Sequence, residues 1–295
     1  MIGVDWGTSN FRAFRLGAEG AILDRRGSPL GILHVPGGRF AETLSAEIGD
    51  WLRAGEDRVL LCGMVGSRQG WQEAPYVPCP AGIAELARAV TAVPFTGARV
   101  RLVTGISTLD PQGVPDVIRG EETKIVGVPA ALGKAGLVCL PGTHSKWVSL
   151  SGGRIARFAT HMTGEVFGVL REHSILGRMM RQGPPDWVAF DCGLARAAEP
   201  GGWLHHLFGV RTLGLTGELG EAAASSYLSG LLIGHEVRAA LPAGALVHLL
   251  GAPALTVPYA RAIAALGGVV RCEDEDAAAR GLAAIGAVIN WDAGD

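Results

Sequence analysis

Two short, glycine-containing segments rich in hydroxyl groups could bind phosphate. The first is Gly7-Thr8-Ser9-Asn10 and the second is Gly142-Thr143-His144-Ser145. Each follows a short apolar run and leads into another, so each is expected to be the turn of a hairpin between two strands. Glycine lets a ligand approach the backbone, and the amide and hydroxyl groups of such a turn can donate hydrogen bonds to an anion. Either turn alone is ordinary, but two copies at matching places predict a pair of phosphate-binding turns.

The residues flanking the two turns differ in charge. Asp5 precedes the first turn, whereas Leu140 holds the corresponding place before the second. Because Mg²⁺ prefers oxygen ligands and phosphate, Asp5 is predicted to be the metal-binding residue of a nucleotide site. Arg12 and Lys146 follow the turns and could counter the charge of the phosphates, although either could equally be a solvated strand residue. His144 is left outside the catalytic set.

Other nucleotide-binding motifs do not fit the chain. The segment from Gly127 to Ala135 has five residues between its glycines and ends in alanine. A P-loop needs four residues there and a hydroxyl side chain for magnesium. No G-x-G-x-x-G stands between an expected strand and an expected helix. Both the P-loop and the Rossmann interpretations are therefore set aside.

Longer segments resemble a family of sugar-acid kinases. Residues 2–10 and 142–146 resemble the first and second phosphate motifs of the sugar kinase, hsp70 and actin superfamily. Residues 63–80, 119–123, 141–147 and 162–165 resemble the 2-dehydro-3-deoxygalactonokinase family. The resemblance implies an α/β, two-lobed ribonuclease H-like (actin-like ATPase) fold with a nucleotide cleft between the lobes. The expected division is an N-terminal lobe over residues 1–133, a C-terminal lobe over 134–275, and a terminal helix over 276–295 that returns to the first lobe.

The resemblance also implies an activity. Members phosphorylate 2-dehydro-3-deoxy-D-galactonate to 2-dehydro-3-deoxy-6-phospho-D-galactonate in galactonate degradation, with ATP and Mg²⁺. One alternative keeps the fold but changes the substrate to another sugar or sugar acid. Another is an actin-like or chaperone-like ATPase, which would need an insert or a polymer surface for which 295 residues leave little room.

The segment Gly120-Glu121-Glu122-Thr123 resembles the Gly-Asp-Gln-Gln segment of glycerol kinase-like enzymes. By that match Glu121 is the general base, and a carboxylate suits the task because the attacking alcohol must lose its proton. The alternative is a solvated acidic first turn that complements a helix dipole. If this segment aligns with the Gly-Asp-Gln-Gln segment in a different register, Glu122 and not Glu121 would be the general base.

The predicted substrate segment follows the apolar run 59–61 and so should emerge at the end of a strand. It resembles the Asn-Gln-Arg-Glu segment of glycerol kinase-like enzymes, and its candidates are Ser67, Arg68, Gln69 and Tyr76. Arg68 could form a two-pronged bond with the substrate carboxylate, with a surface salt bridge as the alternative. Gln69 could bind hydroxyls or the keto oxygen. Tyr76 is divided evenly between a pocket wall and ordinary packing, and Trp71 is expected in the core.

Two later segments belong to the expected second lobe. Gly251 ends an expected strand and resembles the adenosine motif, but Ala252 and Pro253 follow it where the family has further glycine. A helix is expected over residues 257–266. Another is expected over 166–176, with Thr163 as its cap and Glu165 in its first turn.

The amino-acid composition limits what kind of protein this chain can be, where it is located and what it can bind. The 44 glycines in 295 residues are about twice the average usage of roughly 7%, and 48% of residues are hydrophobic, which excludes disorder. A net charge of −2 gives no basic field for nucleic acid or membrane. The five cysteines form no C-x-x-C pair, and no signal peptide is recognisable, so a cytoplasmic location is expected. His205 and His206, in an expected loop, match no zinc pattern. The expected partner is a small-molecule substrate, and a homodimer remains open.

Overall fold

The computed structural model describes residues 1–128, 135–274 and 276–292. The described chain divides into two compact units. Unit 1 comprises Met1–Gly136, Val148–Phe158 and Asp274–Asp295, and unit 2 comprises Leu137–Trp147 and Ala159–Glu273. The expected boundary between residues 133 and 134 lies outside the described residues, as does residue 275 at the second boundary.

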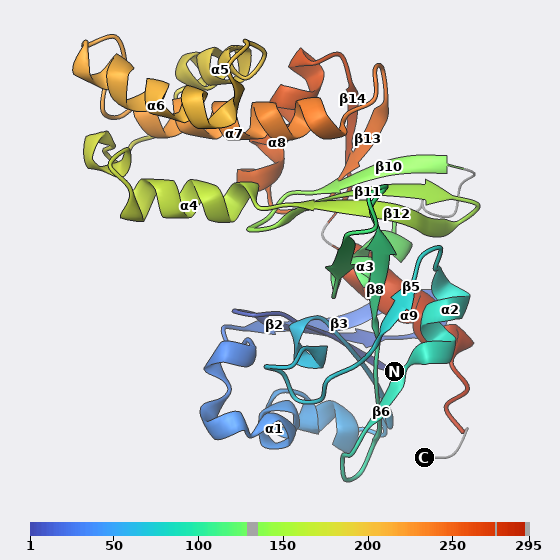
Figure 1. The fold of residues 1–295 in the computed structure, drawn as a ribbon. Helices are drawn as coiled ribbons and strands as arrows, with labels where there is room; N and C mark the ends of the chain where they lie inside the picture. Colours follow the sequence, from blue (N-terminus) through green and yellow to red (C-terminus); the bar gives the residue numbers. More distant parts are fainter. Residues whose placement is uncertain (129–134, 275, 293–295) are drawn as a thin grey trace. The chain divides into compact units, whose positions relative to one another are not determined.

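Unit 1, whose strands β2, β3 and β6 are labelled in Figure 1, is built on a mixed sheet with the strand order β3-β2-β1-β4-β7-β6. Its strands are β1 (Ile2–Trp6), β2 (Phe11–Leu16), β3 (Ile22–Ser28), β4 (Arg58–Cys62), β6 (Thr91–Val93) and β7 (Arg99–Leu102). β1 pairs with β2 antiparallel and with β4 parallel. Every residue of β1 is buried, as a central strand requires. A smaller sheet has the order β5-β8-β9, from β5 (Tyr76–Pro78), β8 (Gly105–Leu109) and β9 (Pro115–Ile118).

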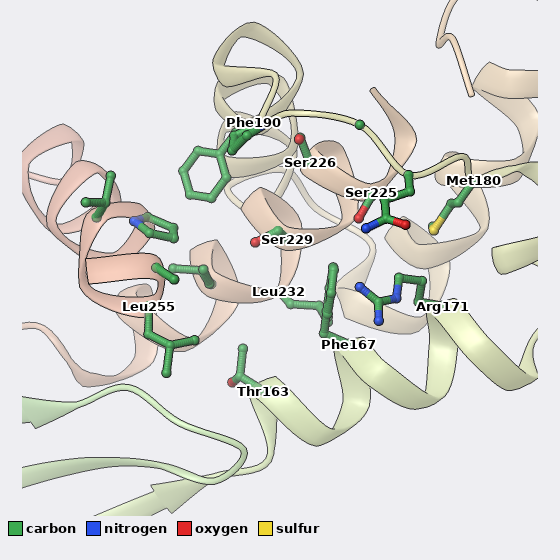
Figure 2. A pocket seen from close by; sticks show the side chains of 18 of the residues that line it. Thr163, Phe167, Arg171, Met180, Phe190, Ser225, Ser226, Ser229, Leu232 and Leu255 are labelled. Carbon is green, nitrogen blue, oxygen red and sulfur yellow. The ribbon is translucent and has the colours of Figure 1, made fainter. Parts of the chain in front are cut away.

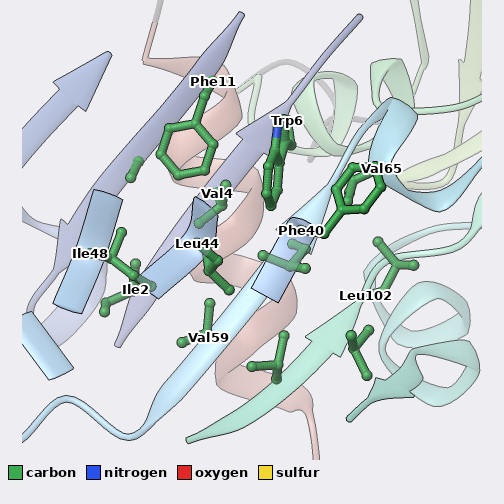
Figure 3. Close-up of a cluster of buried hydrophobic side chains, with 14 of the residues drawn as sticks. Ile2, Val4, Trp6, Phe11, Phe40, Leu44, Ile48, Val59, Val65 and Leu102 are labelled. Atoms are coloured by element: carbon green, nitrogen blue, oxygen red, sulfur yellow. The ribbon is translucent and has the colours of Figure 1, made fainter. Parts of the chain in front are cut away.

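The core of unit 1 lies between the six-stranded sheet and helix α1 (Phe40–Arg53) (Figure 3). Phe40, Leu44 and Ile48 recur every four residues along α1, so they form one buried helical face. They pack with apolar residues of β1, β2, β4 and β7. Trp71 packs against this core and contacts the rings of Trp6, Phe40 and Phe95, as expected for a core residue.

The helix α9 (Ala277–Val288) packs against α3 (Glu121–Val126), with α2 (Ile83–Ala89) also against it. Glycine makes the close approach of α9 and α3 feasible. A Cβ atom at Gly127 would lie 1.9 Å from the carbonyl oxygen of Ala277, and one at Gly281 would lie 1.8 Å from that of Thr123. No larger residue fits at either place, so part of the glycine excess is used in helix packing.

Unit 2 consists of helices and of strands from a sheet with the order β12-β11-β10-β13-β14, of which residues Val148–Phe158 in β11 and β12 belong to unit 1. The strands are β10 (Ala135–Leu140), β11 (Ser145–Ser151), β12 (Arg154–His161), β13 (Leu246–Leu249) and β14 (Val269–Cys272). The helices are α4 (Thr163–His173), α5 (Trp187–Arg196), α6 (Gly202–Leu215), α7 (Ala224–Ala240) and α8 (Pro253–Ala265).

Short 3₁₀ helices occur in both units, at η1 (Ala18–Gly20), η2 (Ile32–His34), η3 (Pro36–Gly38), η4 (Met64–Gly66) and η6 (Gly177–Met179).

Three local expectations were wrong. Thr163 is the first residue of α4 and not its cap, because the cap position is Met162, without a side-chain bond. The helix after Gly251 begins at Pro253, since proline fits the first helical turn, where its missing N–H is not needed. His205 and His206 lie in α6 and not in a loop, because the preceding glycines stand at the start of that helix.

No helix within the described ranges combines the length and apolar character that a membrane crossing would require.

Candidate functional site

The first phosphate turn joins β1 to β2 in unit 1. The N–H of Gly7 donates to the carbonyl of Asn10 at 2.9 Å, while Thr8, Ser9 and Asn10 are exposed. Arg12, on β2, is exposed as well. A neighbouring segment supports the turn from behind, with the N–H of Ile32 on the carbonyl of Gly7 at 3.0 Å. The turn is therefore fixed on one side and open on the other.

Gly31 packs directly against this turn. A Cβ atom there would lie 2.3 Å from the carbonyl oxygen of Thr8 and 2.3 Å from the carbonyl carbon of Ser9. Both are backbone atoms and cannot move without displacing the turn. The glycine is thus a condition for the shape of the first phosphate turn.

Asp5 lies one residue before the end of β1 and is buried. Its Oδ2 is 3.4 Å from the Nζ of Lys124 on α3. The Asp5 carboxylate, and to a lesser extent Glu121, raises the pKa of Lys124 above its ordinary value. The end of β1 and the start of α3 therefore form one charged cluster.

Two glycines with left-handed backbone bring these elements together. Gly63 follows β4 with φ 97°, and a Cβ there would be 2.7 Å from the carbonyl oxygen of Trp6. Gly120 precedes α3 with φ 98°, and a Cβ there would be 2.9 Å from the Cα of Gly63. Side chains at these two places would push α3 away from Asp5.

Glu121 and Glu122 open α3 in different surroundings. Glu121 is partly exposed, and its Oε2 accepts a hydrogen bond from the N–H of Arg119 at 3.0 Å. Glu122 is fully buried and accepts from the N–H of Gly120 at 2.6 Å and from the Thr123 hydroxyl at 3.0 Å. Burial, with the nearby Glu121, raises the pKa of Glu122 to about 8. The alternative of a solvated acidic first turn therefore does not hold for Glu122. Of the two carboxylates, Glu121 is the one that a ligand can reach.

The predicted substrate segment divides between exposed and packed side chains. Arg68 is 87% exposed and pairs with Glu73 at 3.0 Å, which is the surface salt bridge weighed as its alternative. Gln69 is exposed, and the Ser67 hydroxyl donates to the carbonyl of Met64 at 2.7 Å. Tyr76 is 40% exposed. The substrate roles of these residues remain predictions.

The second phosphate turn joins β10 to β11 in unit 2 and is supported by α4. The N–H of Glu165 donates to the carbonyl of Thr143 at 2.9 Å. A Cβ at Gly164 would lie 2.3 Å from the carbonyl oxygen of Gly142. Glu165 also pairs with the Nε2 of His144, which gives this carboxylate a partner in the turn. The first turn of α4 therefore holds the second phosphate turn.

Lys146 has a position unlike that of Arg12. It is buried, and its Nζ donates to the carbonyl of His144 at 2.7 Å, across the end of the turn. Its ammonium group therefore lies at the turn itself.

A buried carboxylate behind the second turn was not predicted. Glu236, on α7 and 4% exposed, accepts hydrogen bonds from the Ser145 hydroxyl at 2.7 Å and from the Trp147 indole N–H at 2.7 Å. Its other oxygen accepts from the Tyr259 hydroxyl at 2.6 Å. The sequence signal was present, since Glu236 interrupts an apolar helical stretch, but its partners are remote in the chain.

Unit 2 also contains a cavity of about 850 Å³ next to the second turn (Figure 2). Gly142 and the first turn of α4 line one side, and Pro253 to Val257 of α8 line another. Side chains of α4, α5 and α7 complete it, among them Phe167, Arg171, Phe190, Ser225, Ser226, Ser229 and Leu232. The volume lies in the range of small-molecule and cofactor sites. Gly251 is exposed, just before the part of α8 that lines the cavity.

Within the described parts of the chain, no group of three or more histidine, cysteine, aspartate or glutamate side chains is placed to hold a metal ion. A single carboxylate can still bind Mg²⁺ when substrate phosphates supply further oxygens.

The comparisons with known proteins agree with one another. The model of the 2-keto-3-deoxy-galactonokinase family matches residues 5–285. A probable 2-dehydro-3-deoxygalactonokinase of Rhizobium meliloti (strain 1021) is 38% identical over 290 residues, 95% of this chain and 94% of the relative. The 2-dehydro-3-deoxygalactonokinase of Escherichia coli (strain K12) is 35% identical over 269 residues, 90% of each chain.

Solved structures extend the similarity to the fold. The crystal structure of a putative 2-dehydro-3-deoxygalactonokinase from Sinorhizobium meliloti has a TM-score of 0.89 at 37% identity and covers 96% of this chain and 97% of its own. The activator of the 2-hydroxyisocaproyl-CoA dehydratase from Clostridium difficile, with bound ADPNP, has a TM-score of 0.51 at 13% identity. The match covers 98% of this chain and 95% of the activator. The predicted α/β fold of actin-like ATPases is confirmed.

Proposed function

Because this chain belongs to the 2-keto-3-deoxy-galactonokinase family, we propose that it transfers a phosphoryl group from ATP to the 6-hydroxyl of 2-dehydro-3-deoxy-D-galactonate. The product is 2-dehydro-3-deoxy-6-phospho-D-galactonate, in galactonate catabolism. The chain is a sugar-acid kinase, a phosphotransferase with an alcohol acceptor, and the family match spans nearly all of it.

Glu121 is the proposed general base. The observation that carries this role is a partly exposed carboxylate at the start of α3, in the same cluster as Asp5 and beside a second carboxylate that is fully enclosed. The N–H of Arg119 fixes its orientation. A carboxylate so placed can accept the proton that the acceptor hydroxyl loses as it bonds to phosphorus.

The two turns are the proposed phosphate-binding groups. Thr8, Ser9, Asn10 and Thr143 are exposed, so their hydroxyl, amide and backbone groups are available to an anion. The N-terminus of α4 adds the favourable end of a helix dipole next to the second turn. Lys146 and Arg12 supply positive charge.

Asp5 is the proposed Mg²⁺ residue, acting through a metal-bound water. A buried carboxylate whose partner is a cation fits this role, because Mg²⁺ commonly uses one or two carboxylates plus substrate phosphates. When bound, the ion would neutralise charge on the phosphates. Asp5 would hold the ion through that water, and Lys124 lies 3.4 Å from the same carboxylate.

The cavity of unit 2 is the proposed adenosine site. It adjoins Gly142 of the second phosphate turn and the start of α8, just after Gly251. Aromatic and apolar side chains can cover the faces of a base, while hydroxyls on α7 offer polar contacts.

Replacement of Glu121 tests the proposed chemistry. Glu121→Gln keeps the side-chain size but removes the basic oxygen, so kcat should fall about 100- to 10,000-fold while ATP binding stays close to wild type. The readouts are a coupled assay for ADP and calorimetry with ATP. Glu42→Gln, an exposed carboxylate on α1, is the control. A fully active Glu121→Gln enzyme would overturn this assignment.

A substrate panel separates the alternative functions. The wild-type enzyme is assayed with ATP and several sugar acids, neutral sugars and no acceptor. Preference for another acceptor would indicate a different sugar kinase, and ATP hydrolysis without any acceptor would indicate an ATPase.

Cellular location and assembly form part of the same proposal. All five cysteines are free, which fits the reducing cytoplasm. Light scattering of the purified enzyme tests for a homodimer.

A further inference from the structure

The side chain of Arg119 is a buried cation with unused hydrogen-bonding capacity. Arg119 lies between β9 and α3 and is 8% exposed. Its Nη2 donates to the carbonyl of Ala74 at 2.7 Å. Its Nε and Nη1 are buried and have no hydrogen-bond partner among the residues that the structure describes. Such a group costs free energy unless something else pairs with it.

The predicted substrate segment encloses this guanidinium. The ring of Tyr76 lies over it, with 4.4 Å between the Arg119 Cζ and the ring centroid. On another side, a Cβ at Gly66 would lie 2.9 Å from Nη1, so glycine leaves the space that the guanidinium needs. Tyr76 is itself 40% exposed, so the ring that covers one face of the guanidinium also reaches solvent.

The donors of Arg119 are arranged for a carboxylate. Nη2 carries two hydrogens, one on each edge of the guanidinium, and Nε and Nη1 complete those edges. The bond to Ala74 uses one of the Nη2 hydrogens, so one edge retains two donors. Two parallel hydrogen bonds from such an edge are the strong way to bind a carboxylate.

Arg119 is also linked to the proposed base. Its backbone N–H donates to Glu121 Oε2 at 3.0 Å. One short segment thus carries both a cation for an acid group and a base for a hydroxyl, and a sugar acid presents these two groups on one molecule. Arg68, by contrast, is 87% exposed and already paired with Glu73.

We propose that Arg119, and not Arg68, binds the carboxylate of the sugar acid, and that Tyr76 moves aside to admit it. This inference rests on the proposed function, since it identifies the residue that recognises the acid group of that substrate. It makes Arg119 the residue that separates acids from neutral sugars.

The experiment pairs two substrates with two variants. The substrates are 2-dehydro-3-deoxy-D-galactonate and its carboxamide, which has the same shape without the charge. Arg119→Met should lower kcat/KM for the acid about 10- to 100-fold, leave KM for ATP unchanged, and affect the carboxamide much less. Arg68→Met tests the competing assignment, and Arg88→Met, at an exposed arginine of α2 that pairs with Glu85, is the matched control that should change neither substrate. An acid-specific loss in Arg68→Met, or equal losses for both substrates in Arg119→Met, would overturn the inference.

A second variant guards against misfolding. Arg119→Lys keeps the charge but cannot form the two-pronged contact. It should raise KM for the acid with kcat and thermal unfolding close to wild type, and an unchanged KM would count against the inference. Wild-type enzyme that fails to phosphorylate the acid would overturn the proposed function itself. If the wild-type enzyme phosphorylates the acid, but the Arg119 variants lose the same activity toward the acid and its carboxamide, this inference alone would be overturned.

Discussion

The two turns predicted to bind phosphate are alike in sequence and differ in what supports them. Behind the first, Asp5 faces the ammonium of Lys124. Behind the second, Glu236 accepts three hydrogen bonds from neutral groups. The first turn is thus backed by a charged pair and the second by a carboxylate whose acceptor sites are engaged.

This difference teaches which carboxylate is available for chemistry. A cation partner can be exchanged for another cation, so Asp5 remains able to meet a metal ion. Glu236 has both oxygens committed to the Ser145, Trp147 and Tyr259 side chains, and it ties β11 to α7 and α8. We infer that Asp5 serves the reaction and that Glu236 serves the structure.

Among the changes that compare the two turns, the largest expected effect comes from displacing one of them. Gly31→Ala and Gly164→Ala each place a Cβ atom 2.3 Å from backbone of the first or the second turn. A misplacement of about 1 Å can cost about 100-fold in rate, and we expect a loss in kcat/KM of that order from each.

Two other glycines provide controls for these variants. Gly27→Ala adds a Cβ 3.8 Å from the Phe11 carbonyl oxygen, and Gly168→Ala meets nothing within 4 Å. Both should retain wild-type steady-state kinetics. If only one of the two test variants loses activity, the two turns do not contribute equally to phosphate binding.

Removing the two carboxylates should separate activity from stability. Asp5→Asn should lower kcat about 10- to 100-fold, with little change in the urea midpoint. Glu236→Ala removes the acceptor of the buried Trp147 and Tyr259 donors, while the Ser145 hydroxyl keeps the carbonyl of His161 at 3.4 Å. Each unpaired donor costs about 1–3 kcal/mol, so the free energy of unfolding should fall by at least ~2 kcal/mol.

The conservative variant sharpens this result. Glu236→Gln keeps the shape and one carbonyl acceptor, so it should recover most of the stability and retain near wild-type kcat. Loss of turnover in a stable Glu236→Gln enzyme would show that the proposed division between chemistry and structure is wrong.

The smallest effect is expected for the pair between His144 and Glu165. Both side chains are substantially exposed, and exposed ion pairs contribute about 0–1 kcal/mol. His144→Ala should therefore shift thermal unfolding no more than Arg39→Ala, which breaks a surface pair with Glu42 on α1. A loss of several kcal/mol in the free energy of unfolding would mean that this pair, and not the backbone contact between Glu165 and Thr143, holds the second turn.

Local pattern was enough to predict the elements around the turns. A strand was expected on each side of both turns, and β1 and β2 flank the first turn as β10 and β11 flank the second. Alternating or continuous apolar runs interrupted by glycine and hydroxyl residues are a short-range signal. The local match also led to Glu121, whose role as base remains a prediction.

Long-range packing explains what the sequence could not reveal. Ser145 and Glu236 are 91 positions apart, and Arg119 and Ala74 are 45 apart. Nothing in the vicinity of Glu236 or Arg119 indicates these partners. Arg68 was favoured because it lies inside a recognisable motif, whereas burial, which depends on the whole unit, distinguishes it from Arg119.

The glycine contact between α9 and α3 has a consequence for biosynthesis. Residues 277–288 pack on the helix that begins with Glu121, more than 150 positions earlier. During translation the amino-terminal sheet can form early, yet α3 lacks this neighbour until residues 277–288 have left the ribosome. A nascent chain therefore completes the packing around Glu121 only after more than 150 further residues are made, and a product that stops before α9 would carry the proposed base on an uncovered helix.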